Sequence, residues 1–285
     1  MKNMHALYID DLTEAVAVDL KKQVVQDPVM RPYPLNYHER KQQILPAGSM
    51  LQKNLDKIEN FTNANQMKIN ESKSKVMIFN QSKKYDFPPE FSFANGQILD
   101  CMEETKLLGI LLNTSLKWNS NCHAIYTNAM SRMWLLRRMK LLNLEPQLIF
   151  DYYLKEIRSL AEQGVVVWNS GMTKYLSNEL EKFQKVAMKI ILGDNYTTYE
   201  GSYNFFKVAK LSSRRSDLCT NYAIKLFKSK RSREFFTPYS VSGRTKHTKL
   251  VKENTCRTTR CFNAPLNYLA RLVNMNKNKI ESSLK

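Results

Sequence analysis

The chain has 285 residues, and its hydrophobic content of 43% is enough for a packed core in one large or two ordinary domains. No apolar run approaches the ~18 residues of a membrane-spanning helix, and the first residues contain no apolar signal segment. We therefore expect a protein that is neither secreted nor inserted in a membrane. The five cysteines are odd in number and scattered, which favours reduced thiols in the cytoplasm or nucleus.

Positive charge is concentrated toward the C-terminus. The net charge is +18, and residues 200–285 hold 19 Lys and Arg against 5 Asp and Glu, a balance of +14. Such a local excess favours contact with a polyanion over a merely solvated basic surface. An anionic membrane leaflet is a less favoured partner, because no strongly amphipathic basic helix with Trp or Phe anchors is evident.

The first structured element is predicted over residues 4–18. Asp10 and Asp11 stand side by side between two apolar runs, a pattern that predicts strand, tight turn, strand, with the acids at the turn. Adjacent carboxylates repel unless they are solvated or share a cation, and Mg2+ takes such oxygen ligands together with substrate phosphates. The pair is either a solvated hairpin tip or part of a metal site.

A long loop and then a helix are predicted next. Residues 24–48 contain four of the nine prolines together with Gly48, which predicts a long irregular loop. Ser49 can cap a helix over residues 49–65, where apolar residues recur at helical spacing. Strands are expected over 75–79, 91–99 and 105–112, with Asn95-Gly96 as a hairpin turn. With the first hairpin they would form a small antiparallel sheet backed by helix.

Beyond Trp118 the apolar spacing becomes helical. Helices are predicted over residues 121–141, 145–162, 177–192, 199–209 and 213–229, with a last short helix near 268–273. Pro146 suits a first helical turn, and Gly193 a left-handed C-cap. The composition of residues 240–249 is typical of a linker. We therefore predict an α+β protein that is mostly α, with domains at 1–118, 119–239 and 240–285.

Five stretches, taken in order, carry a family resemblance. Tyr8-Ile9-Asp10-Asp11 is similar to the Y-x-D-D motif of reverse transcriptases. Residues 68–79 resemble the L-x-x-N-x-x-K-T segment that follows it, and residues 105–118 resemble the K-Y-L-G primer-grip strand and its W sequel. Residues 181–193 resemble a Q-K-x-A-x-x-I-I-L-G helix, and residues 257–265 an R-T-x-R-x-x-N-x-P segment. The collinear set resembles the C-terminal part of non-LTR (LINE-type) retrotransposon reverse transcriptases over nearly the whole chain.

The resemblance implies RNA-directed DNA synthesis on an RNA template and a DNA primer, with two Mg2+ ions. It assigns metal binding and catalysis to Asp10 and Asp11, of which Asp10 is the stronger candidate. Lys73 matches a lysine near the incoming triphosphate, where it would act as a point charge. Leu107-Leu108-Gly109 matches the primer grip, although the family usually has an aromatic residue where Leu107 stands. The fold implied is a remnant palm sheet, then an all-α thumb and a C-terminal extension.

The resemblance also implies a limit on activity. Only seven residues precede Tyr8, whereas the family's fingers and third metal-binding carboxylate precede the motif. We therefore expect this chain to be a reverse-transcriptase fragment that is inactive alone. The alternative is a non-enzymatic basic nucleic-acid-binding protein derived from a retroelement, whose carboxylates are relics. The oligomeric state stays open.

Basic side chains of the later helices are the candidate contacts to nucleic acid, because phosphate neutralisation supplies most non-specific affinity. The aromatic residues among them are expected to pack in the core rather than stack on bases. Cys256 and Cys261 lack the further ligands of a zinc knuckle. The candidate nucleic-acid-binding residues are Arg137, Arg138, Arg214, Arg215, Lys225, Lys228, Lys230, Arg231 and Arg233.

Overall fold

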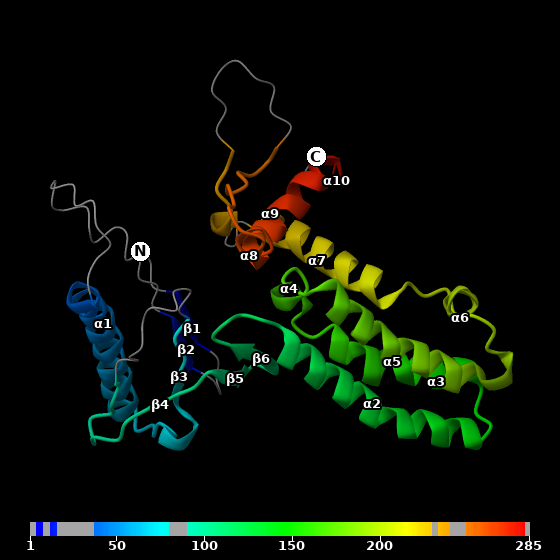
Figure 1. Cartoon of the computed structure of the whole chain (residues 1–285), viewed down its shortest axis with the longest axis horizontal. Coiled ribbons are helices and arrows are strands. Elements are labelled where there is room, and N and C mark those ends of the chain that lie inside the picture. The colour runs from blue at the N-terminus through cyan, green and yellow to red at the C-terminus, as the bar shows by residue number, and fades with distance from the viewer. Residues whose placement is uncertain are drawn as a thin grey trace, which may run out of the picture. The chain divides into compact units, whose positions relative to one another are not determined.

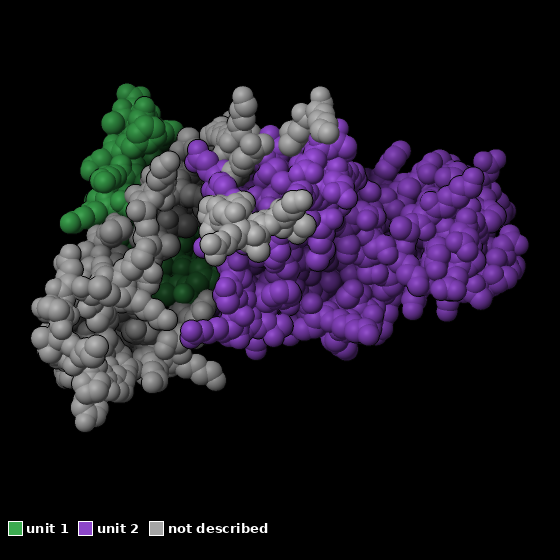
Figure 2. Space-filling model, turned by 90° about the horizontal axis from the view of Figure 1, so that it is seen from above, with its two compact units in different colours: residues 1–105 green, residues 106–285 purple. Residues whose placement is uncertain are grey.

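The computed structural model describes residues 4–7, 12–15, 37–79, 90–229, 233–239 and 249–282. The chain divides into two compact units, residues 1–105 and 106–285 (Figure 2). The described residues are mostly helical, with a few short strands, which confirms the α+β class (Figure 1). Trp118, where we placed the end of the first domain, lies within the second unit. No helix in the described part of the chain is long and apolar enough to cross a membrane.

The first unit opens with the predicted hairpin. Strands β1 (Met4–Leu7) and β2 (Leu12–Ala15) pair antiparallel, with Leu7 opposite Leu12 and Met4 opposite Ala15. The two strands are therefore confirmed. Residues 8–11, which carry both aspartates, connect them and lie outside the described residues.

Helix α1 (Tyr37–Ala64) corrects the loop predicted over residues 24–48. Residues 37–48 are helical, Pro46 included, and residues 24–36 lie outside the described part. An interior proline costs about 3 kcal/mol because it removes one hydrogen bond and clashes with the preceding turn. Helix propagation is cooperative, so one such residue does not end a 28-residue helix.

A tight turn at Asn95-Gly96 reverses the chain beside α1. Gly96 has φ +83°, and the Phe93 amide donates to the Gln97 carbonyl at 2.9 Å, which confirms the predicted hairpin. The Gln52 side chain of α1 donates to the Ser92 carbonyl at 2.7 Å and accepts from the Ser92 amide at 3.1 Å. One amide side chain thus satisfies both backbone groups that a neighbouring strand would otherwise pair.

The strands do not form the single antiparallel sheet that we expected. Among the described residues there are three two-stranded sheets, and β3 (Lys75–Val76) pairs in parallel with β4 (Asp100–Cys101). The strand predicted over 105–112 is instead a hairpin of β5 (Glu104–Leu107) and β6 (Ile110–Asn113). Its turn residues Leu108 and Gly109 have φ of +47° and +85°, the left-handed values of a tight hairpin turn.

The second unit is a helical assembly (Figure 1). α5 packs against α2 and α7, and α7 packs against α9. One hydrophobic core, between Ile110 and Ile280, holds these helices together. The helices are α2 (Asn119–Leu141), α3 (Pro146–Tyr152), α4 (Val165–Trp168), α5 (Lys174–Leu192), α6 (Tyr199–Phe205), α7 (Leu211–Lys228), α8 (Thr259–Phe262), α9 (Pro265–Met275) and α10 (Lys277–Ser282).

The helix predicted over residues 145–162 changes type along its length. Pro146 starts α3 as expected, but a π-helical turn (Tyr153–Ile157) and a 3-10 turn (Arg158–Ala161) follow. The buried residues Ile149, Tyr153, Ile157 and Ala161 recur every four positions. An α-helix repeats every 3.6 residues, so a wider turn keeps all four on one face.

Helix α5 begins and ends on recognisable caps. Thr173, rather than the expected Ser177, accepts from the Leu176 amide at 3.3 Å. Gly193 ends the helix with φ +56°, although its ψ of −124° lies outside the left-handed helical region. Lys140 of α2 donates to the Ile191 carbonyl at 3.0 Å. The side chain of one helix therefore caps the C-terminus of its neighbour.

Candidate nucleic-acid interface

The predicted catalytic residues can be placed only in part. Asp10 and Asp11 lie outside the described residues, so no geometry of a metal site is available from them. Among the described residues, no group of three or more His, Cys, Asp and Glu side chains could hold a metal ion. Strands β1 and β2 nevertheless pair antiparallel on either side of the Tyr8–Asp11 motif, as the sequence pattern predicts.

Lys73 ends a 3-10 turn (Glu71–Lys73) and has an exposed side chain. The Asn70 side chain caps this turn: its oxygen accepts from the Lys73 amide at 3.3 Å and from the Ser72 hydroxyl at 2.8 Å. The three-residue spacing of Asn70 and Lys73 in the N-x-x-K segment is therefore explained by this cap, in which the Asn70 side chain binds the Lys73 amide. It fixes the backbone of the lysine while leaving the ammonium group in solvent.

The Leu107-Leu108-Gly109 segment forms the turn of the β5–β6 hairpin. The side-chain Nε2 of Gln163 donates to the Leu108 carbonyl at 3.3 Å. A Cβ added at Gly109 would lie 2.3 Å from the same Nε2 atom. The positive φ of Gly109 favours glycine there, and a side chain at this position would also displace the end of the Gln163 side chain. The Leu108 side chain is exposed although its φ is also positive.

The predicted basic residues do not share one surface. Arg137 and Arg138 are exposed on α2, and Lys225 and Lys228 are exposed on α7. α5 packs between these two helices (Figure 1). No ion pair joins any of the four to a carboxylate within the described part of the chain. Lys230, Arg231 and the side chain of Arg233 lie outside the described residues.

One predicted contact, Arg215, is wrong, and a second, Arg214, is paired with a carboxylate. Arg215 is 1% exposed and belongs to the core, where it donates to Asn169 at 3.2 Å and to Ser177 at 2.7 Å. Arg214 is held by Glu162, whose two carboxylate oxygens accept from it at 3.1 and 3.2 Å. The apolar face of α7 passes through position 215, so an adjacent pair of arginines does not point to one surface.

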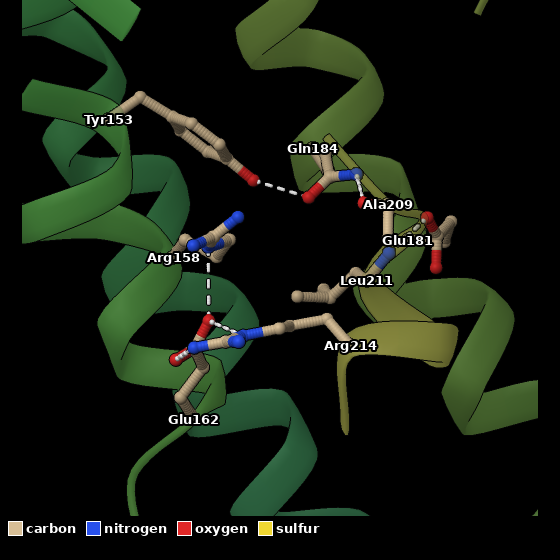
Figure 3. A network of polar contacts seen from close by, with 8 residues as sticks. All are labelled: Tyr153, Arg158, Glu162, Glu181, Gln184, Ala209, Leu211 and Arg214. Carbon is tan, nitrogen blue, oxygen red and sulfur yellow. Dashed lines mark hydrogen bonds and ion pairs between the residues drawn. The ribbon is translucent and has the colours of Figure 1, made fainter. Parts of the chain in front are cut away.

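A network of polar contacts joins α5 and α7 to the segment of residues 153–162 (Figure 3). Glu162 pairs with Arg158 at 3.0 Å as well as with Arg214. The buried Gln184 accepts from the Tyr153 hydroxyl at 2.8 Å and donates to the Ala209 carbonyl at 3.4 Å. Burial raises the pKa of Tyr153, which keeps its phenol protonated as a donor. The glutamine of the family-like segment 181–193 is therefore structural in this chain.

The sequence analysis did not include Trp134 among the candidate contacts. This indole is 60% exposed on α2 and lies one helical turn from Arg137 and Arg138. α2 has 23 residues and contains no Asp or Glu, while Leu141 continues the same exposed face. The sequence already contained the indication: Trp134 precedes the two arginines by three and four positions, in a segment that has no Asp or Glu.

A second feature that was missed combines lysine and tyrosine on α5, α6 and the segments beside them. The Lys185 ammonium lies 5.3 Å from the centroid of Tyr199, and that of Lys189 lies 5.6 Å from Tyr196. Lys210 stands 5.7 Å from Tyr203. Such pairs hold a cation over an aromatic ring at the surface.

The aromatic residues near the end of α7 divide between core and surface. Phe227 and Phe236 are buried and pack together with ring centroids 6.1 Å apart, as expected. Tyr222 and Phe235 are exposed instead.

Searches among models of protein families, curated proteins and solved structures found no match to this chain.

Proposed function

We propose that this chain is part of a retroelement reverse transcriptase and that its helical unit binds the RNA–DNA template–primer. The observation that carries the binding proposal is the exposed face of α2, where Trp134, Arg137 and Arg138 occur in a helix without acidic residues. Arginines can neutralise phosphates, and an exposed aromatic ring can stack on a base or sugar. The collinear motifs support the family assignment.

The distribution of charge between the two units favours the helical unit as the part that binds. Residues 1–105 contain 13 Lys and Arg against 14 Asp and Glu, a balance of −1. Residues 106–285 contain 31 against 12, a balance of +19. The positive charge of the whole chain thus belongs to the helical unit, which is the part expected to attract a polyanion.

In this proposal the first unit supplies the end of the polymerase palm. Asp10 and Asp11 would hold Mg2+, which supplies activation of the primer hydroxyl and stabilisation of the leaving pyrophosphate when bound. Lys73 would face the triphosphate, and the Leu108-Gly109 turn would contact the primer backbone. Because the resemblance matches only two of the family's three metal-binding carboxylates, we expect binding to be measurable without primer extension.

The binding proposal is tested by fluorescence anisotropy with a labelled RNA–DNA duplex at several salt concentrations. Arg137→Ala with Arg138→Ala should lower the slope of log affinity against log salt by about two, because each phosphate contact contributes about 0.9 for B-DNA. Trp134→Ala should weaken binding with little change in slope. Lys155→Ala with Lys174→Ala, two exposed lysines outside α2 and α7, is the matched control. Equal slopes for the α2 variant and this control would overturn the assignment to α2.

The non-enzymatic alternative gives a different pattern. It attributes binding to the basic side chains alone, so Lys225→Glu with Lys228→Glu should weaken binding. Asp10→Ala should leave binding unchanged under either function. Primer extension by the chain that is lost in Asp10→Ala would show a working polymerase and would contradict the alternative.

A further inference from the structure

Two cysteines near the C-terminus lie close together. The Cys261 thiol, at the end of α8, donates a hydrogen bond to Cys256 with the two sulfurs 3.1 Å apart (α8 in Figure 1). Cys261 is exposed and Cys256 is half-buried, so reagents can reach the pair. No group of three metal ligands occurs in the described residues, and the chemistry available is that of two neighbouring thiols.

Side chains of α8 and α9 hold this pair in place. Asn267 of α9 donates to the Cys261 carbonyl at 2.7 Å and to the Cys256 sulfur at 3.4 Å. Thr258 caps α8 by accepting from the Cys261 amide at 3.2 Å. The Arg271 guanidinium lies 3.6 Å from the ring centroid of Phe262, and it donates to the Phe262 carbonyl at 2.6 Å. The juxtaposition of the thiols is therefore built by a second helix rather than by chain proximity alone.

We propose that Cys256 and Cys261 form a reversible dithiol–disulfide couple whose oxidant is a low-molecular-weight disulfide such as oxidised glutathione. A disulfide requires a sulfur–sulfur distance of about 2.05 Å, so the sulfurs need to approach by only about 1 Å. Formation of the bond closes a short ring that contains Arg257 and Arg260 and fixes the preceding segment to α8. This inference does not depend on the proposed nucleic-acid binding.

The exchange proceeds in two steps. The exposed Cys261 thiolate attacks one sulfur of oxidised glutathione, which releases one glutathione thiolate and leaves a mixed disulfide. The Cys256 thiolate then attacks the Cys261 sulfur and releases the second glutathione. The protein loses two electrons and two protons, and the oxidised glutathione becomes two molecules of reduced glutathione. Cys261 is the more exposed of the two thiols, which agrees with its reacting first with the external disulfide.

The other three cysteines serve as internal comparisons. Cys122 and Cys219 are buried, and burial raises the pKa of each thiol to about 11, so both should react slowly. Cys101 is exposed, and no hydrogen bond joins it to another of the five cysteines. It should therefore keep glutathione as a stable mixed disulfide, whereas the couple should release it.

The test equilibrates the full-length protein in mixtures of reduced and oxidised glutathione and maps tryptic peptides without reduction. Trypsin cuts after Arg257 and Arg260, so the disulfide joins two separate peptides, residues 253–257 and 261–271. We expect this linked pair in mixtures that glutathionylate Cys101. Glutathione retained on Cys261 with no linked pair would overturn the proposal.

Three variants and one probe separate the couple from chance reactivity. Cys261→Ser should abolish the linked pair and leave Cys256 with a stable glutathione, while Cys101→Ser should leave the couple unchanged. Phenylarsine oxide, which requires two adjacent thiols, should bind once to the reduced protein and not to Cys261→Ser. Equal binding of this arsenical to both proteins would contradict a paired site. Asn267→Ala should need a higher proportion of oxidised glutathione to reach half-oxidation, and an unchanged midpoint would contradict positioning by α9.

Discussion

Arg215 is a cation in the core of the helical unit. It is 1% exposed, its partners are the neutral side chains of Asn169 and Ser177, and one terminal nitrogen has no hydrogen-bond partner. Burial lowers its pKa, which shows the cost of removing the guanidinium from water. A buried charge of this kind gives less stability than its hydrogen bonds suggest, because desolvation offsets them.

We therefore expect the volume of Arg215 to matter more than its charge. Arg215→Ala should lower the free energy of unfolding by about 2–5 kcal/mol, as other large-to-small core changes do. Arg215→Met fills most of the space without a charge to desolvate and should cost less than half as much. Urea denaturation measures both, with Arg214→Met as the control on the same helix. Equal losses for Met and Ala would show that the hydrogen bonds to Asn169 and Ser177 dominate.

The buried thiols of Cys122 and Cys219 give a pH dependence. Burial raises the pKa of each to about 11, above the value that a thiol has in the unfolded chain. The unfolded chain therefore releases these protons first as pH rises. The contribution of the protonated thiols is fully present below the unfolded pKa and is lost as the pH rises toward 11.

Between pH 8 and pH 10 the wild-type protein should lose about 1 kcal/mol per buried thiol through this effect. The double variant Cys122→Ala with Cys219→Ala lacks both groups and should lose correspondingly less. Urea denaturation at both pH values measures the difference, and lysine titration cancels in the comparison. Parallel losses for the two proteins would show that these thiols have ordinary pKa values.

At the scale of elements, α7 depends on another helix for its N-terminal cap. No side chain of α7 or of Lys210 caps the first turn. The Glu181 carboxylate of α5 instead accepts from the Leu211 amide at 2.9 Å (Figure 3). It also accepts from the Ser212 amide at 3.1 Å. Tyr199 donates to the same carboxylate, and burial together with this bond raises the pKa of Tyr199. A negative charge at a helix N-terminus is stabilising because it meets the positive end of the helix dipole.

Glu181→Gln should lower the free energy of unfolding by about 1 kcal/mol, because it keeps the shape but removes the charge. The loss should be local at first, with faster amide hydrogen exchange in the first turn of α7. Glu179→Gln, on the same helix, is the matched control, since Glu179 forms an ion pair with the exposed Lys182. Unchanged exchange at Leu211 and Ser212 in Glu181→Gln would show that the carboxylate does not cap α7.

These elements also show what the sequence could predict. Apolar spacing located α2, α5 and α7 within a few residues, because local periodicity decides which face of a helix is buried. The sequence analysis predicted one helix over residues 145–162 and missed its division into α, π and 3-10 turns. This division depends on how Tyr153 and Ile157 pack in the core, which local spacing does not show. Arg215 was misplaced for a related reason: Asn169 and Ser177, which make its burial tolerable, come from other parts of the chain. For α2, the sequence was enough to select Trp134 as a candidate contact. The helix contains arginines and a lysine but no Asp or Glu, so its exposed face carries positive charge alone.

At the scale of the whole molecule, the two units differ in charge and in core. The hydrophobic core cluster lies between Ile110 and Ile280, so its members come from the second unit alone. The same unit carries the whole positive balance, +19 against −1 for residues 1–105. Folding and polyanion binding should therefore be separable from the hairpin that carries Asp10 and Asp11.

A fragment of residues 106–285 should accordingly fold on its own and keep the affinity of the full chain for an RNA–DNA duplex. Its core is complete, so circular dichroism should show a cooperative thermal transition. Its slope of log affinity against log salt should match that of the full chain, because that slope counts released counterions. The fragment is compared with the unaltered full chain and with a fragment that carries Arg137→Ala and Arg138→Ala. A fragment that melts without cooperativity would show that the first unit completes the fold. A cooperative fragment with a much smaller slope would place phosphate contacts in residues 1–105, despite their negative balance.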